Sequence, residues 1–192
     1  PDGSQFAQCS DEALSIVDTR TGKTLRTLKR DGLENAAYSP DGKWLLASTD
    51  EECQVLSTKT WKVERTLQID SSYPRAAISR DSTWVAFEGL SKTLNLWSLA
   101  TGKVVVSRPA DPIATQAVAW SADGSVLFVL NYDRTLQVLG RKDAKPLQTL
   151  DLGLLGNDRG HSLALSADGK RLGVGTERGL VLVFDVQLTA QA

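Results

Sequence analysis

Short apolar segments alternate with polar turns along the whole chain, and none of them sustains the three- and four-residue apolar spacing of a helix. The segments are rich in β-branched and aromatic residues, as half-buried strands are. Val126 to Asn131 and Leu136 to Gly140, for example, flank the polar turn Tyr132-Asp133-Arg134. The pattern predicts an all-β protein of short antiparallel strands with essentially no helix.

One phrase, with an aspartate at its centre, recurs along the chain. Its aspartates are Asp2, Asp41, Asp81, Asp123 and Asp168, at intervals of 39, 40, 42 and 45 residues. A period near 40 residues with strand-like content is typical of β-propeller blades. In most copies glycine follows the aspartate, a pair that favours a tight turn because glycine accepts positive φ. Each phrase should therefore close a hairpin.

Each full period contains four strand candidates, which should form one four-stranded antiparallel sheet. A second turn signature joins the third and fourth strands, at Thr21-Gly22-Lys23, Thr60-Trp61-Lys62, Thr101-Gly102-Lys103 and Asp143-Ala144-Lys145. Eighteen strands are expected in all. The sequence thus predicts a single β-propeller domain or partial propeller over residues 1–192, with blades at 1–32, 33–70, 71–111, 112–155 and 156–192.

The first blade should lack its innermost strand and the last blade its outermost strand. The chain starts at Pro1, contains no Met and opens inside a repeat, so we expect it to be a fragment of a longer propeller. Closed propellers avoid exposed strand edges. Another segment could complete the ring, copies could associate through their open blade edges, or five blades could close alone.

Several segments resemble WD40 repeats. Asn131 to Leu139 is similar to the stretch S-x-D-x-T-hydrophobic-x-hydrophobic-W, and Leu94 to Ser98 and Val183 to Asp185 are close to its Trp-Asp ending. The chain departs from that family by lacking the Gly-His pair, because His161 directly abuts a first strand. Ile16 to Lys23 leans toward the related YVTN-type propellers. The resemblance covers nearly the whole chain and implies a WD40-like or YVTN-like β-propeller repeat protein.

Charge and composition exclude several partner classes. The 22 basic and 23 acidic residues leave a net charge of −1, so the electrostatic footprint of a nucleic-acid binder is absent. No stretch approaches the roughly 18 apolar residues of a membrane-spanning helix. Cys9 and Cys53 lack the number and spacing of a disulfide scaffold or a metal site. We therefore expect no nucleic-acid partner, no membrane partner and reduced cysteines.

No motif indicates catalysis. A single histidine, His161, excludes a multi-histidine metal site, and neither cysteine is matched with it in sequence or repeat register. The repeated aspartates occupy the same turn in every blade, which favours a structural role. No glycine-rich phosphate loop opens a helix. We expect a protein that is not an enzyme, with no catalytic, cofactor-binding or metal-ligating residues.

The resemblance implies that protein segments bind where the fourth-to-first and second-to-third connections emerge. Tyrosine and arginine are over-represented among interface hot spots. The candidate partner-binding residues on that face are Tyr73, Arg75, Tyr132, Arg134, Arg159 and Arg178. The alternative is that each is an ordinary solvated loop residue. The insertion from Leu150 to Gly160 either carries function or covers a blade edge.

Two tryptophans, Trp97 and Trp120, fall at strand positions that are apolar in other periods, which predicts burial. Trp61 replaces a turn glycine and should be exposed, as a candidate contact at the opposite end of the blades. The expected function is a non-catalytic protein–protein interaction scaffold, a module of a larger signalling or regulatory protein. The alternative is a propeller that binds a small molecule or hydrolyses a sugar or lactone, with Arg75 and His161 at the channel mouth.

Overall fold

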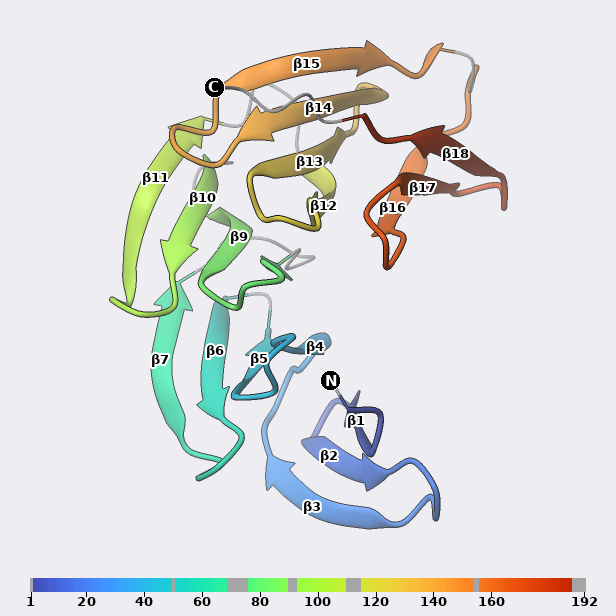
Figure 1. The fold of residues 1–192 in the computed structure, drawn as a ribbon. Helices are drawn as coiled ribbons and strands as arrows, with labels where there is room; N and C mark the ends of the chain where they lie inside the picture. The colour runs from blue at the N-terminus through green and yellow to red at the C-terminus, as the bar shows by residue number, and fades with distance from the viewer. Residues whose placement is uncertain are drawn as a thin grey trace. The chain divides into compact units, whose positions relative to one another are not determined.

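The structure, a computed structural model, describes residues 2–49, 51–68, 76–89, 93–109, 115–153 and 156–187. Eighteen strands form five antiparallel sheets of three or four strands, and these ranges contain no α-helix. Within each sheet, every strand pairs with the next along the chain (Figure 1). The chain divides into two compact units, residues 1–74 with 88–91, and residues 75–87 with 92–192. The predicted all-β architecture is confirmed.

The first unit contains two sheets, coloured blue to cyan in Figure 1. Their strands are β1 (Gln5–Cys9), β2 (Ala13–Asp18) and β3 (Thr24–Lys29), then β4 (Asn35–Tyr38), β5 (Trp44–Ser48), β6 (Glu52–Ser57) and β7 (Val63–Gln68). Phe6 pairs with Val17 across the first sheet. Leu14, Ile16 and Leu45 are at most 1% exposed in one shared core cluster.

Three sheets lie mainly in the second unit. Their strands are β8 (Ala77–Ile78), β9 (Trp84–Gly89), β10 (Thr93–Ser98) and β11 (Lys103–Pro109), then β12 (Thr115–Trp120), β13 (Val126–Asn131), β14 (Thr135–Gly140) and β15 (Pro146–Asp151), and finally β16 (Gly160–Leu165), β17 (Arg171–Thr176) and β18 (Val181–Asp185). The expected strands are present. The largest difference is β8, which is shorter than the segment 75–79 expected from sequence.

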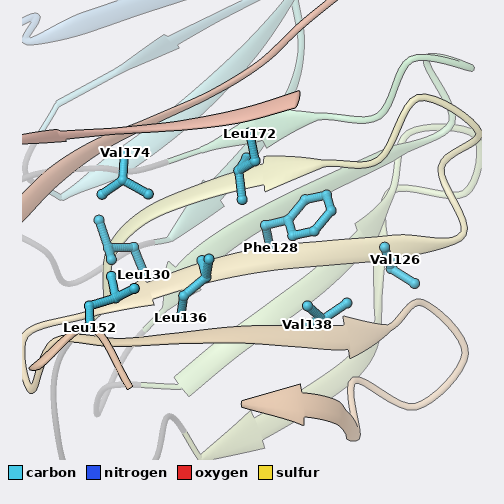
Figure 2. Close-up of a cluster of buried hydrophobic side chains, with 8 residues drawn as sticks. All are labelled: Val126, Phe128, Leu130, Leu136, Val138, Leu152, Leu172 and Val174. Carbon is cyan, nitrogen blue, oxygen red and sulfur yellow. The ribbon is translucent and has the colours of Figure 1, made fainter. Parts of the chain in front are cut away.

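Side chains from facing sheets share the core of the second unit. Figure 2 shows Val126, Phe128 and Leu130 of β13, with Leu172 and Val174 of β17. Every second residue of a strand points to the same face, and the opposite face of β13, with Leu127 and Val129, belongs to a second core cluster. Leu130 and Val174 are fully buried. Trp97 and Trp120, predicted to be core residues, are 1% and 6% exposed.

The repeated serine–aspartate phrase closes hairpins through side-chain hydrogen bonds. Ser121 Oγ donates to Asp123 Oδ1 at 2.6 Å and accepts from the Val126 N–H at 3.1 Å. The same two bonds form in three further copies, Ser39-Asp41, Ser79-Asp81 and Ser166-Asp168. The residue after each of these aspartates has positive φ, including the non-glycine Ser82 at 56°. The aspartates therefore have the structural role expected of them.

Trp61 is not the freely exposed residue that the sequence predicted. It does occupy the glycine position of the turn, with φ of 59°. Its ring is half-buried against the core cluster of the first unit, and the Arg26 guanidinium lies 5.5 Å from the ring centroid. The prediction that Trp61 is exposed rested on its turn position alone. The large indole ring instead packs against neighbouring apolar side chains.

Replacing Ser121 with alanine should lower the free energy of unfolding by about 1–3 kcal/mol, because the N–H of buried Val126 loses its side-chain acceptor. Ser166→Ala removes the same pair of bonds at an exposed turn and should cost less. Urea unfolding of both variants measures the difference. Equal losses would show that burial of the turn is irrelevant.

Acid should destabilise the protein through these turns. The Ser121 hydroxyl, followed by the Ser125 N–H, lowers the pKa of Asp123, and the Ser166 hydroxyl lowers that of Asp168. A carboxyl with a lowered folded-state pKa stabilises the fold while ionised, and this contribution is lost as pH falls through that pKa. Urea unfolding should show declining stability below about pH 5. Unchanged stability down to pH values that protonate model carboxyls would contradict the assignment.

Candidate functional site

Three connections meet at one end of the strands in the second unit and form the candidate site. They are the β13–β14 turn at 132–134, the described parts of the β15–β16 loop at 152–153 and 156–159, and the β17–β18 turn at 177–180. In antiparallel sheets alternate connections emerge at the same end. Among the sequence-predicted residues, Tyr132, Arg134, Arg159 and Arg178 lie on these connections. Tyr73 and Arg75 lie outside the described residues.

Arg134 connects the β13–β14 turn to the β15–β16 loop. Its guanidinium donates a hydrogen bond to the carbonyl of Gly156. Its own carbonyl accepts from the Leu152 N–H at 2.8 Å, and Leu152 is 1% exposed. The residue adopts a left-handed backbone, with φ of 67°. Arg134 therefore positions the loop, and its guanidinium is already engaged within the fold.

Asp158 connects the same loop to the β17–β18 turn. Its Oδ1 accepts from the backbone N–H of Arg159 at 2.8 Å and of Arg178 at 3.2 Å. The side chain is 3% exposed. The Thr176 hydroxyl is the largest cause that lowers the Asp158 pKa, which keeps the carboxylate ionised at neutral pH. The Glu177 N–H adds a 3.0 Å bond to the Arg159 carbonyl.

Sequence reasoning did not single out Asp158. The available signal was local: an aspartate two residues before a strand often accepts backbone N–H groups. Its partner across the site, Arg178, is 20 residues away, so the bond itself was not visible in the sequence. Glycine fits at position 160, close to Asp158, because the Cβ of any other residue there would lie 2.7 Å from Leu130 Cδ2. The start of β16 therefore packs directly against the core.

Tyr132, Arg159 and Arg178 are exposed around this network. Their backbones are fixed by the turn and loop hydrogen bonds, while their side chains face solvent. Acidic Asp133 and Glu177 are exposed beside them. The result is a mixed-charge surface with one aromatic side chain on a preorganised backbone, which lowers the ordering cost of binding.

The described residues offer no metal-binding group of three or more His, Cys, Asp or Glu side chains. Cys9 in β1 and Cys53 in β6 are unpaired, and burial raises the pKa of Cys53 to about 12. A thiol with this pKa is protonated at neutral pH and is a poor nucleophile. His161 is exposed at the start of β16. No described helix has the length and apolar character needed to cross a bilayer.

No protein-family model matches the chain. A WD repeat-containing protein, SL1-17 of Schistosoma mansoni, is 26% identical over 110 residues, which are 57% of this chain and 36% of that protein. The β-propeller domain of Myceliophteria thermophila Cps50 (Swd1) aligns with a TM-score of 0.82 at 16% identity, covering 96% of this chain and 63% of that one. The chain thus spans about a third of the first protein and less than two thirds of the second.

Replacing Asp158 with alanine should lower the free energy of unfolding by about 1–3 kcal/mol, because two backbone N–H groups lose a buried acceptor. The amides of Arg159 and Arg178 should exchange with solvent faster, which NMR hydrogen exchange measures. Asp133→Ala is the control, since that carboxylate bonds only within an exposed turn, to Thr135. The assignment is wrong if both variants behave alike.

Proposed function

We propose that this WD40-like β-propeller repeat protein is a non-catalytic protein–protein interaction scaffold. It would work as a module of a larger signalling or regulatory protein. Its partner would be a protein or peptide segment bound at the loop end of the second unit. The supporting observation is the hydrogen-bonded network through Arg134 and Asp158, which holds exposed Tyr132, Arg159 and Arg178 on one surface.

The chemistry of this surface suits a polypeptide partner. Tyrosine supplies a large contact area with few rotatable bonds, and arginine supplies several donors to carboxylates and backbone carbonyls. Arg134 also contributes in this proposal, by holding the loop that carries Arg159. The nearby acidic residues Asp133 and Glu177 would select against a purely acidic partner. We therefore expect a partner segment with mixed polar character and at least one carboxylate.

Site-specific cross-linking tests this function. A photoreactive amino acid at Tyr132 or Arg178 should capture a discrete partner from cells that express the protein. The same group at Leu147 or Lys170, which are exposed at the other end of the strands in the same unit, is the matched control. Equal capture at both ends would contradict the assigned face.

The captured partner then allows a quantitative test. The double change Arg159→Glu with Arg178→Glu should weaken its binding by about tenfold or more, a loss of 1.4 kcal/mol per factor of ten. Lys142→Glu with Lys170→Glu makes the same change in charge at the turn end and should have little effect. Unchanged affinity in the arginine variant, with folding verified by circular dichroism, would eliminate these residues from the interface.

A further inference from the structure

The first unit contains a second candidate site, at the turn end of its strands. A cavity of about 440 Å³ opens there between its two sheets. Its lining includes Asp2, Gln5, Tyr38, Asp41, Thr58 and Trp61. Asp2 and Gln5 lie at the start of the first sheet, Tyr38 and Asp41 at the β4–β5 hairpin, and Thr58 and Trp61 between β6 and β7. The cavity is independent of the loop end of the second unit.

The repeat provides an occupied counterpart of this cavity within the second unit. Thr58 and Arg141 hold the same place, because each donates its backbone N–H across the sheet to the second residue after the turn aspartate, Lys43 and Ser125 respectively. In the same register Asp2 corresponds to Asp81. The repeat therefore allows the two inter-sheet regions to be compared position by position.

In the second unit an arginine side chain fills this position. Arg141 Nη1 lies 3.5 Å from Asp81 Oδ2, and its guanidinium carbon lies 5.9 Å from the centroid of the Trp84 ring. The carboxylate supplies charge and the ring face supplies a cation–π contact. This region of the fold is thus shaped to hold a guanidinium between a turn aspartate and an aromatic ring.

The first unit has the carboxylate without the arginine. Thr58 is short, and its hydroxyl donates to the Gly42 carbonyl at 2.6 Å, so it does not extend to Asp2. Gln5 occupies the position of Trp84, and two aromatic side chains, Tyr38 and Trp61, line the cavity instead.

Two observations indicate that these aromatic groups suit a cation. The buried hydroxyl of Tyr38 finds no hydrogen-bond partner among the described residues, so its oxygen is available to accept from an N–H donor. The Trp61 ring already has the Arg26 guanidinium 5.5 Å from its centroid. Asp41 and Lys43 are also charged and lie at the exposed rim, where Lys43 Nζ lies 3.3 Å from Asp41 Oδ2. Asp2 has no such lysine in its turn, where Ser4 corresponds to Lys43.

We propose that this cavity binds the guanidinium group of an arginine side chain presented by a partner peptide. Asp2 provides the negative charge, the Tyr38 oxygen accepts one N–H, and Trp61 contributes a ring wall. The bound guanidinium takes the role that Arg141 performs within the second unit. Arginine is preferred to lysine because its planar fork bonds a carboxylate and a phenol oxygen together.

NMR titration with a blocked tripeptide, acetyl-Gly-Arg-Gly-amide, tests the proposal. The backbone amides of Ser4, Gly42 and Thr58 should shift in a saturable manner. The citrulline tripeptide has the same shape without the charge and should bind at least about tenfold more weakly, a difference of 1.4 kcal/mol. Equal binding of both peptides, or no shift at these amides, overturns the proposal.

Two variants locate the site. Thr58→Arg should fill the cavity from within, reproduce the ion pair that Arg141 makes with Asp81 and abolish the peptide-induced shifts. Asp2→Asn keeps an oxygen acceptor for the Ser4 N–H but removes the charge, and should weaken binding at least about tenfold. Asp18→Asn is the matched control outside the cavity. Unchanged titrations in both cavity variants, with native circular dichroism spectra, contradict the assignment.

The reciprocal variant is the most specific test. Arg141→Thr removes the internal arginine from the second unit, and the arginine tripeptide should then also shift the amides of Asp81 and Gly124. No new shifts in this variant would show that the two regions are not equivalent. Failure of these titrations leaves the cross-linking result at Tyr132 unaffected, so the two functional assignments can be separated.

Discussion

The fold depends on one small hydrogen-bonded unit, the serine hydroxyl that bridges its turn aspartate and the first N–H of the next strand. This unit closes the hairpin between the first two strands of a sheet, and it recurs at a period near 40 residues. With the turn set, successive residues of β13 point to opposite faces of its sheet, and the face with Val126, Phe128 and Leu130 shares a core with β17. The loops at the other end of the strands are then free to differ between repeats.

The same constraint separates structural from functional positions. At the turn end, Oδ1 of Asp123 and of its equivalents accepts local hydrogen bonds in each repeat, whereas Arg141 and Thr58 differ at equivalent places. At the loop end, Arg134 and Asp158 make bonds that no other described repeat reproduces. The regular repeat thus contains residues that differ between repeats at both ends of the strands. One proposed binding surface includes such residues at the turn end, and the other includes them at the loop end.

Strands and turns were predictable from the sequence because their signals are local. A short apolar run rich in β-branched and aromatic residues identified β13, and the aspartate phrases identified the hairpins. The hydrogen-bond network of the candidate site was not predictable, since the bond between Asp158 and the Arg178 N–H joins residues that are distant in sequence. The prediction that Trp61 is exposed was wrong for a related reason. Its turn position is a local property of the sequence, whereas its contact with Arg26 depends on the fold. Candidate residues Tyr132, Arg159 and Arg178 were identified by type and place, and their common network emerged only in three dimensions.

The central claim is that the loop end of the second unit binds a polypeptide. Hydrogen–deuterium exchange of the protein, alone and with the partner captured through Tyr132, tests it most directly. Exchange should slow at 132–134, 156–160 and 177–179 and stay unchanged at the turns around Asp123 and Asp168. Protection confined to those turns, or none at the loops, would contradict the claim.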